Sequence, residues 1–524
     1  MSIEREIEIK LILPDGDPAP LLALAPFRRA PRILHFHTRY YDTPDWSLSR
    51  ARAILRIRCS GDQIIQCVKM PASNARPTDR AEWERPLESD QLALELLPPS
   101  PRHRLEQLIN DQPLRPFATL EVTRRIWIVA HRGSQIEMAL DSGTINANGQ
   151  QVQIAELELE LVDGRVDDMI DFALGLPLGP GLAWSMCSKG ARAHMTARGL
   201  HPAAIKASPV TLSPHLTSAQ AFQEIAWHCL GHLLGNYRLV IDMGDADALH
   251  QSRVAIRRMR AACSLFSSML NDAPSRLIRA ELRAAASALG PARDLDVLIA
   301  RIHEDIGAVA DYAPLMAQLE QQRRAAYEHA TALLNCASFQ RLLFQLAAWI
   351  ENGAWLNGLK AIDSVEQDLP VPIASPNLAS TCAHELQSRY RKVKKAGQHF
   401  QQLDAPGRHQ LRIEIKKLRY AADFFGSLFP GSAQCDEQRK PHQAFVDALT
   451  RLQDLLGELN DLATGREIDV GAMDSINEIE QARLTLMLDQ ALRTSGRTEK
   501  QLINDATHDL DQALHLPRFW RDQA

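Results

Sequence analysis

The hydrophobic periodicity of this 524-residue chain changes near residue 200. Before that point, short segments alternate polar and apolar residues with a period of two, as strands with one buried face do. These segments are 4–12, 54–59, 63–69, 80–87, 119–129, 135–141 and 152–162. Turn signals such as Ser60-Gly61-Asp62 and His131-Arg132-Gly133 separate them. The pattern predicts an antiparallel, hairpin-rich β region over residues 1–200.

A different pattern begins at residue 217. Long segments rich in Ala, Leu, Arg, Gln and Glu show helical spacing at 217–240, 247–270, 275–303, 313–333, 337–352, 376–402, 407–427, 440–461 and 475–494. A stretch at 201–216 contains Pro202, Pro209 and Pro214 and is interpreted as a linker. The sequence therefore predicts a multidomain α+β protein whose second half, residues 217–524, is all-helical.

Composition limits the class of protein. The net charge of −5 is small for this length, so binding of polyanions would have to come from local clusters of basic residues. The eight cysteines include no CxxC pair, which argues against a zinc knuckle or a disulfide framework. No signal-peptide pattern and no apolar stretch of about 20 residues is present. We therefore expect a cytoplasmic protein without a membrane span.

Charged residues share strand faces in the first 200 positions. Successive side chains of a strand point to opposite sides, so one face of the first strand carries Glu4, Glu6, Glu8 and Lys10. A late strand repeats the pattern with Glu156, Glu158 and Glu160. Near residue 120, Arg125 shares a face with Glu121, and Arg124 takes the other face. Other strand faces carry Arg56, Arg58, Lys69, Arg80, Glu82, Glu84, Glu137 and Asp141.

Two arrangements are compatible with these faces. In an ordinary sandwich they would be exposed to solvent. In a barrel of about eight strands they would line a charged interior, and the apolar faces would pack outward against helices. Clustered carboxylates call for a cation, and clustered arginines and lysines call for an anion. Because Mg²⁺ combines carboxylates with phosphate oxygens, the barrel would suit a polyphosphate substrate.

The segment Glu6-Ile7-Glu8-Ile9-Lys10 resembles the ExExK signature of the CYTH superfamily, the triphosphate tunnel metalloenzymes. Further similar motifs follow in family order over residues 1–200: Tyr41-Asp42-Thr43, Leu55-Arg56-Ile57-Arg58, Lys69, Arg80-Ala81-Glu82-Trp83-Glu84, Leu140-Asp141-Ser142-Gly143, Glu156-Leu157-Glu158-Leu159-Glu160 and Ser188-Lys189. One departure is the segment Ala51-Arg52-Ala53-Ile54, which lacks the glycine common in the family just before the Leu55-Arg56-Ile57-Arg58 motif.

This resemblance implies an eight-stranded antiparallel tunnel with flanking helices that hydrolyses or rearranges triphosphates with Mg²⁺ or Mn²⁺. The implied metal ligands are Glu6, Glu8, Glu156, Glu158 and Glu160. The implied phosphate-binding residues are Lys10, Arg56, Arg58, Lys69, Arg80, Arg125 and Lys189. The catalytic set would be Glu6, Glu8, Lys10 and Glu158.

The helical half contains a repeat. The segment 250–260 returns as 409–419, and Leu289-Gly290-Pro291 returns as Leu456-Gly457-Glu458, which predicts two related bundles at about 217–370 and 376–520. On a helix, the basic residues of each copy fall in one stripe about 80° wide, opposite an apolar side. The stripes are His250, Arg253, Arg257 and Arg260, and His409, Arg412, Lys416 and Arg419. They would face either acidic neighbours or a common polyanion.

This arrangement is similar to the CHAD domain, a helical duplication often found after CYTH. The similarity covers about residues 215–520 and implies that both stripes bind inorganic polyphosphate. Nucleic acid is a weaker candidate partner, because the helical half lacks clear platforms for base stacking.

The sequence thus predicts hydrolysis of inorganic triphosphate to phosphate and pyrophosphate in the tunnel, with polyphosphate binding by the helical domain. Activity should require Mg²⁺ or Mn²⁺ and rise toward alkaline pH, where water and substrate are more deprotonated. One alternative keeps the family and changes the reaction to that of a class-IV-type adenylate cyclase or a thiamine triphosphatase. Another is a non-catalytic protein that binds or targets polyphosphate.

Overall fold

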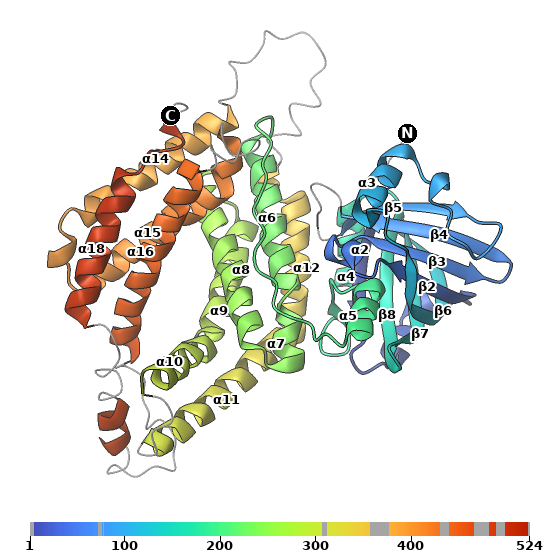
Figure 1. Ribbon diagram of the computed structural model, residues 1–524, viewed down its shortest axis with the longest axis horizontal. Helices are drawn as coiled ribbons and strands as arrows, with labels where there is room; N and C mark the ends of the chain where they lie inside the picture. Colours follow the sequence, from blue (N-terminus) through green and yellow to red (C-terminus); the bar gives the residue numbers. More distant parts are fainter. Residues whose placement is uncertain are drawn as a thin grey trace, which may run out of the picture. The chain divides into compact units, whose positions relative to one another are not determined.

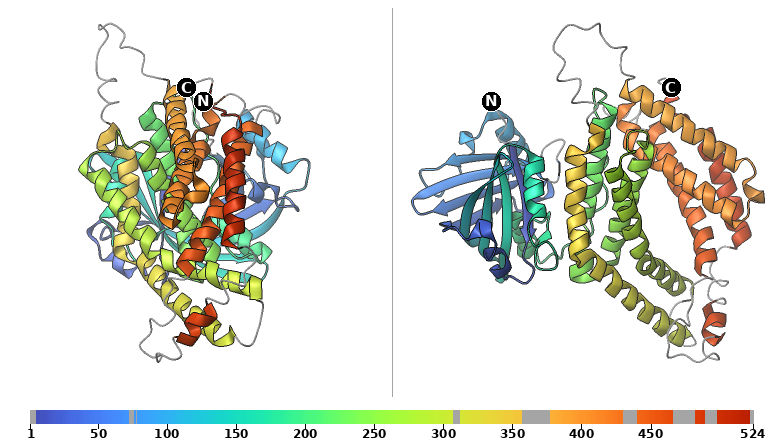
Figure 2. Two further views of the ribbon diagram at one scale, coloured as in Figure 1. Left: turned by 90° about the vertical axis from the view of Figure 1, so that its left-hand side faces the viewer. Right: turned by 180° about the vertical axis from the view of Figure 1, so that it is seen from behind.

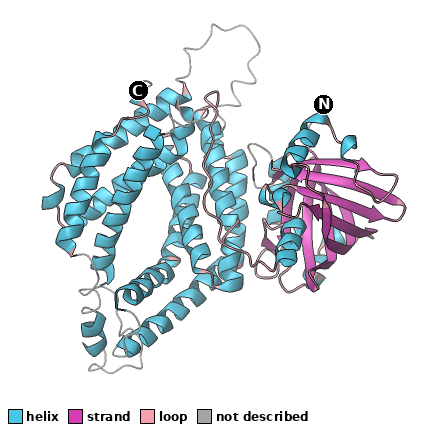
Figure 3. Cartoon of the chain, viewed as in Figure 1, coloured by secondary structure: helices cyan, strands magenta, loops and turns pink. Residues whose placement is uncertain are grey.

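A computed structural model describes residues 5–71, 76, 78–306, 312–356, 377–429, 440–465, 482–488 and 498–521 (Figure 1). In the described part of the chain, strands occur only before residue 185, and every element from residue 218 onward is a helix (Figure 3). Residues 201–213 form neither. The change of periodicity near residue 200 therefore marks a real change of fold class.

The first half forms one antiparallel sheet in the order β5-β4-β3-β2-β6-β7-β8-β1-β9. Its strands are β1 (Arg5–Ile12), β2 (Arg32–Asp42), β3 (Ile54–Ser60), β4 (Gln63–Met70), β5 (Asp79–Pro86), β6 (Arg115–His131), β7 (Ser134–Ala147), β8 (Gln150–Asp163) and β9 (Ala183–Trp184). Seven of these match the alternating segments of the sequence. The segments at β2 and β9 show no such alternation and were not predicted as strands.

Strand β1 has partners on both sides. Residues 8–12 pair with β8, whereas Arg5, Glu6 and Ile7 pair with Ala81, Arg80 and Asp79 of β5, the strand at the other end of the order. The two-residue strand β9 pairs with Leu11 and Ile12 of β1. The sheet therefore has nine strands where eight were expected, because β9 adds a short pairing to β1.

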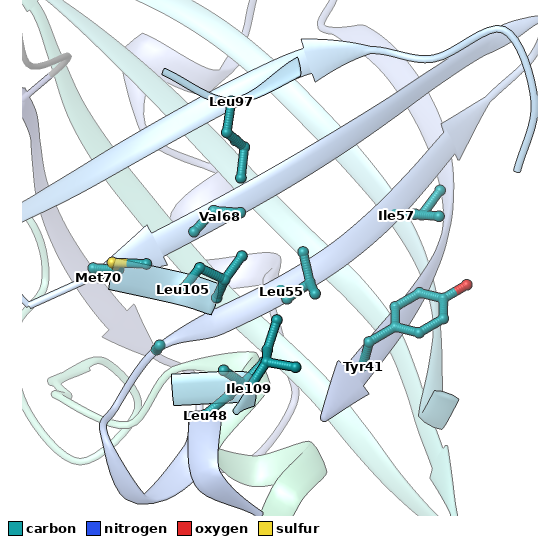
Figure 4. Packing of buried hydrophobic residues seen from close by; sticks show 10 residues of the cluster. Tyr41, Leu48, Leu55, Ile57, Val68, Met70, Leu97, Leu105 and Ile109 are labelled. Atoms are coloured by element: carbon teal, nitrogen blue, oxygen red, sulfur yellow. The ribbon is translucent and has the colours of Figure 1, made fainter. Parts of the chain in front are cut away.

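The outer face of β3 and β4 is apolar and packs against short helices. Leu55, Ile57 and Val68 are almost fully buried against side chains of α2 (Ser47–Arg50) and α3 (Pro99–Ile109), including Leu105 and Ile109 (Figure 4). Since strand residues alternate, the neighbouring Arg56, Arg58 and Lys69 point to the opposite, inner face.

The second half consists of long helices in its described residues (Figure 2). They are α6 (Ser218–Leu234), α7 (Tyr237–Met243), α8 (Ala246–Leu265), α9 (Ala273–Ala288), α10 (Gly290–Ile306), α11 (Ala313–Asn335), α12 (Ala337–Asn352), α14 (Leu378–Gly397), α15 (Ala405–Phe425), α16 (Lys440–Gly465) and α18 (Glu499–His515). The predicted helix 275–303 is broken at Leu289, and α18 was not predicted. Most of the predicted helix 475–494 lies outside the described residues.

Contacts group the chain into two compact units. The first comprises Met1–Lys206, Leu230–Ala248 and Leu334–Gly353, and the second comprises the remainder. Helices α7 and α12 thus belong with the sheet. Within this first unit, the Trp184 ring of β9 stacks on Phe344 with ring centroids 4.4 Å apart, and the Tyr237 hydroxyl donates to the Trp184 carbonyl.

None of the described helices combines the length and the low polarity that crossing a bilayer requires.

Candidate active site

The inner face of the sheet encloses a cavity of about 380 Å³. The residues that line it carry both signs of charge in nearly equal number. The acids are Glu6, Glu8, Glu82, Glu84, Glu137, Asp141, Glu158 and Glu160, and the bases are Lys10, Arg32, Arg56, Arg58, Lys69, Arg124 and Lys189. The charged faces of the strands therefore point into an interior space rather than into solvent.

Strand register separates the three glutamates of β8. Glu160 lies between Glu137 of β7 and Glu8 of β1, so three carboxylates stand side by side. Glu158 lies beside Lys10, and Glu156 lies beside Asp141. Like charges directly opposite each other are destabilising on a sheet, so this carboxylate row (Glu8, Glu137 and Glu160) differs electrostatically from the rest of the strand.

Cations surround the other two glutamates of β8. The Lys189 Nζ lies 2.8 Å from Glu158 and 2.6 Å from Asp141, and it also pairs with Glu156. The Lys10 Nζ lies 2.9 Å from Glu156 and pairs with Glu158. Burial alone would raise the pKa of Glu158, but Lys10, Lys189 and Arg124 hold it well below its usual value. Glu158 is therefore ionised, and the neighbouring cations offset its charge.

The carboxylate row is neutralised less, since the ion pair found there among the described residues joins only Glu8 to Lys10, at 3.0 Å. Burial raises the pKa of Glu160 to about 7, and the charges of Glu6, Glu137 and Glu8 contribute to the rise. The one opposing influence resolved there is Lys69, whose Nζ lies 2.6 Å from Glu6. This end of the cavity would therefore gain from a bound cation.

A second cluster of carboxylates is an alternative site for a cation. Ligand atoms of Asp141, Glu156 and Glu158 lie within 4.8 Å of one another, close enough to share a cation. Protein ammonium and guanidinium groups already occupy this cluster, since Glu156 also pairs with Arg192. A metal ion would have to displace them, so we favour the row of Glu8, Glu137 and Glu160 together with Glu6.

The wall formed by β3 and β4 is basic, with Arg56, Arg58 and Lys69, and the acids Glu82 and Glu84 of β5 lie beside it. Arg58 pairs with Glu84 at 2.6 Å, and Lys69 with Glu82 at 3.0 Å. Among the described residues, the buried Nε atoms of Arg56 and Arg58 have no hydrogen-bond partner. Buried donors without acceptors are costly, which makes this wall suited to an anion rich in oxygen.

The structure corrects part of the predicted phosphate-binding set. Arg125 was expected to line the cavity, but the residues of β6 that do so are Leu120, Val122, Arg124 and Ile126. Arg124 instead faces inward and makes a bidentate pair with Asp141, with both distances 2.7 Å. The prediction for Arg125 is wrong because the inner and outer faces of β6 were exchanged.

Most of the other residues predicted for the site line the cavity, but not all of them do. Glu6, Glu8, Lys10, Arg56, Arg58, Lys69, Glu158, Glu160 and Lys189 all line the cavity. Glu156 does not line it and is fully buried behind it. The side chain of Arg80 lies outside the described residues, although its backbone pairs with Glu6. Asp141 and Glu137 also line the cavity. They were absent from the predicted site, although the sequence places them together on one charged strand face.

In the second unit, the predicted stripes lie on α8 and α15. Their apolar sides, including Ile256 and Ile415, are buried, and the stripe residues of α8 are partly exposed. Arg258, beside the first stripe, is buried and pairs with Asp423 of α15. This ion pair connects the two repeated helices.

An arginine of each stripe lies against a repeated glycine. A Cβ added at Gly290 would lie 3.2 Å from Nη1 of Arg253, and one at Gly457 would lie 3.4 Å from Nη2 of Arg412. Arg253 is 3.7 Å from Asp294. Burial raises the pKa of Asp294, and Arg253, Arg293, Arg257 and Arg412 oppose this rise. Basic residues from both copies therefore converge on one region.

Comparisons with known proteins agree with this division. A model of the CYTH domain matches residues 4–173, and a model of the CHAD domain matches residues 224–468. An inorganic triphosphatase from Haemophilus influenzae is 30% identical over 164 residues, which are 30% of this chain and 44% of that protein. The match thus spans less than half of that relative.

Two further similarities extend beyond the first domain. An uncharacterized protein from Mycobacterium tuberculosis is 25% identical over 519 residues, 91% of this chain and 90% of that protein. The crystal structure of the CHAD domain from the plant Ricinus communis is 25% identical with a TM-score of 0.50, and the match covers 61% of this chain and 99% of that one.

Proposed function

This chain carries a CYTH domain followed by a CHAD domain, and we propose that its CYTH domain hydrolyses inorganic triphosphate to phosphate and pyrophosphate. The observation that carries this proposal is the division of one cavity between a carboxylate row and a basic wall with unsatisfied donors. A cation at the row and a phosphate chain along the wall would complement both. The similarity to an inorganic triphosphatase supports the choice of substrate.

The cavity is proposed to be a tunnel through an eight-stranded barrel. The pairing of β1 with β5 supports this closure, because these strands stand at opposite ends of the main strand order. The proposed domain limits are 1–200 for the tunnel, 201–216 for the linker and 217–524 for the helical domain. The duplication of the helical domain is supported by the equivalent placement of Arg253 on Gly290 and Arg412 on Gly457.

The carboxylate row, together with the neighbouring Glu6, fits a hard divalent cation. Glu6, Glu8, Glu137 and Glu160 offer only carboxylate oxygens, which are the ligands that Mg²⁺ and Mn²⁺ take in proteins. We propose Glu137 as a ligand beside Glu6, Glu8 and Glu160, in place of the expected Glu156 and Glu158, which already pair with Lys10 and Lys189. When bound, the metal would supply Lewis-acid stabilisation of the phosphoryl oxygens.

The protein's own groups would do the remaining work by position and charge. Arg56, Arg58 and Arg124 would bind and orient the phosphates, since guanidinium groups match phosphate oxygens in geometry. Lys10 and Lys189 would hold Glu158 ionised and in place. Positioning and neutralisation of charge dominate catalysis of phosphoryl transfer, so such a wall suffices to explain a large part of the rate.

A phosphate-release assay on the full chain tests the function. Tripolyphosphate, ATP and thiamine triphosphate are compared with Mg²⁺, with Mn²⁺ and without divalent metal. We expect tripolyphosphate to be the best substrate, with activity only in the presence of metal. Preference for thiamine triphosphate, or formation of cyclic AMP and pyrophosphate from ATP, would favour the alternative reactions, and no turnover of any substrate would contradict the proposal.

Neighbouring arginines of β6 provide a matched pair of variants. Arg124→Ala should lower kcat/KM for tripolyphosphate by about a hundredfold, because Arg124 faces the cavity and pairs with Asp141. Arg125→Ala removes the same side chain from the other face of the strand and should leave kcat/KM within about twofold of the wild-type value. Equal losses in both variants would show that the assignment of faces has no functional meaning.

For the helical domain, we propose that the two stripes bind inorganic polyphosphate. The double variant Arg253→Ala/Arg412→Ala should weaken binding of long-chain polyphosphate by about a hundredfold and reduce its dependence on salt concentration. Arg324 is exposed on α11, so Arg324→Ala serves as the control and should change neither property. Titrations of the full chain at several salt concentrations provide the measurement, and unchanged affinity in the double variant would contradict the proposal.

A further inference from the structure

An aromatic ring lies among the charged residues of the cavity. Phe36 of β2 lines the cavity, and its ring centroid is 4.9 Å from Cζ of Arg58 and 5.8 Å from Cζ of Arg124. These two arginines come from different strands, β3 and β6. One phenyl ring thus contacts two of the cations to which phosphate binding is assigned above.

Strand register explains why a single ring reaches both. Strand β2 lies between β3 and β6 in the sheet. On one side, Arg58 is paired with Thr38, two residues beyond Phe36, and on the other side Arg124 is paired with Leu34, two residues before it. Both arginines are therefore diagonal neighbours of Phe36 on the same face, a separation that aromatic and long side chains can bridge.

Each arginine is also held by a carboxylate. Arg58 pairs with Glu84 at 2.6 Å, and Arg124 pairs with Asp141 at 2.7 Å and also with Glu158. A phenyl ring attracts a guanidinium through its π face and takes none of the conventional hydrogen bonds that an oxygen would accept. The ring contact therefore restrains both side chains without using their N–H donors. The Nε of Arg58 is buried and has no hydrogen-bond partner among the described residues.

We propose that Phe36 is a positioning residue that holds Arg58 and Arg124 ready for phosphate oxygens. This inference rests on the proposed triphosphatase function of the same cavity. Long side chains lose conformational freedom when they bind a ligand, and a group already restrained loses less. Phe36 therefore acts on affinity through the two arginines and makes no bond to the reacting atoms.

Substitutions at Phe36 separate this role from simple packing. Phe36→Leu keeps an apolar side chain and removes the π face, and it should raise the KM for tripolyphosphate about tenfold while kcat changes by less than about threefold. Phe36→Tyr and Phe36→Trp retain an aromatic face and should restore the wild-type KM to within about twofold. The control is Ile57→Val, which removes apolar volume from the outer face of β3, between Arg56 and Arg58, and should leave the KM unchanged.

Calorimetric titration of the full chain with tripolyphosphate gives a second readout that does not depend on turnover. The dissociation constant should rise about tenfold in Phe36→Leu and recover in Phe36→Tyr. If the wild-type chain binds and hydrolyses tripolyphosphate but Phe36→Leu behaves as the wild type does, the inference about Phe36 is wrong and the proposed function stands. Equal losses in Phe36→Leu and Ile57→Val would also contradict the inference, because they would show that Phe36 contributes only apolar packing. If the wild-type chain neither binds nor hydrolyses tripolyphosphate, the proposed function itself is wrong, and the inference about Phe36 is wrong with it.

Discussion

The Glu160→Gln variant is expected to be more stable than the wild-type protein in metal-free buffer at pH 8 and to lose most of the proposed triphosphatase activity. The free energy of unfolding should rise by roughly 1–3 kcal/mol, because the amide removes one charge from a row of three carboxylates. Activity should fall by about a hundredfold or more, since the same carboxylate is a proposed metal ligand. Thermal or denaturant unfolding and phosphate release measure the two effects.

The gain in stability should depend on pH in a defined direction. The pKa of Glu160 is raised from its ordinary value of 4.5 to about 7 in the folded protein. Between these values the folded state keeps a proton that the unfolded state has lost, so this group makes the protein less stable as the pH rises. The difference between wild type and Glu160→Gln should be small near pH 4.5 and reach its full size above pH 7.

Metal binding provides the control for this prediction. Mg²⁺ or Mn²⁺ should stabilise the wild-type protein more than Glu160→Gln, because a ligand that binds only the folded state raises stability. Glu121 is exposed on β6, and Glu121→Gln removes a carboxylate without touching the row. That variant should match the wild type in every respect. Full activity and undiminished stabilisation by metal in Glu160→Gln would refute the assignment of the row as the metal site.

The Lys10→Met variant is expected to lose both stability and activity. Lys10 is buried and pairs with Glu8 at 3.0 Å, with Glu156 at 2.9 Å and with Glu158. Removing one partner of a buried ion pair leaves an uncompensated charge, which costs roughly 3–5 kcal/mol. Denaturant titration of the full chain should therefore show that the unit containing the sheet unfolds at a lower denaturant concentration, and phosphate release should fall in parallel.

A second substitution tests the cause of that loss. In Lys10→Met/Glu156→Gln, one of the stranded carboxylates becomes neutral, so part of the lost stability should return. Lys206 is exposed in the segment between the domains, and Lys206→Met should have no effect on unfolding. If Lys10→Met unfolds as the wild type does, the buried network around Glu156 and Glu158 contributes nothing to the stability of the sheet.

Strand prediction succeeded where one face was charged and the other apolar. Seven strands, including β1 and β8, show this alternation, and each appears in the structure. Strand β2 was missed because its inner face carries Leu34, Phe36 and Tyr40 and its outer face includes Ile33 and Tyr41. With apolar residues on both faces, no period of two stands out. Strand β9 has two residues and forms through its pairing with β1, so local sequence could not reveal it.

The candidate site was predicted in outline and misassigned in detail. Alternation showed which residues share a face, but it could not tell which face of β6 points inward. This is why Arg125 was chosen where Arg124 lines the cavity. In the same way, the three glutamates of β8 look equivalent in sequence. Their neighbours across the strands make Glu158 part of an ion-pair network and Glu160 part of the carboxylate row.

By itself, the sequence determined the two fold classes, the change between them near residue 200, most strands and helices, and the presence of both charged strand faces and basic helical stripes. These properties follow from periodicity, which is local. Only the tertiary structure decided how the charges are shared: Lys10 and Lys189 with Glu158, Arg58 and Arg124 with Phe36, and Glu160 with Glu8 and Glu137. Coulomb and π contacts act over a few ångströms, and strand register alone sets which residues come that close.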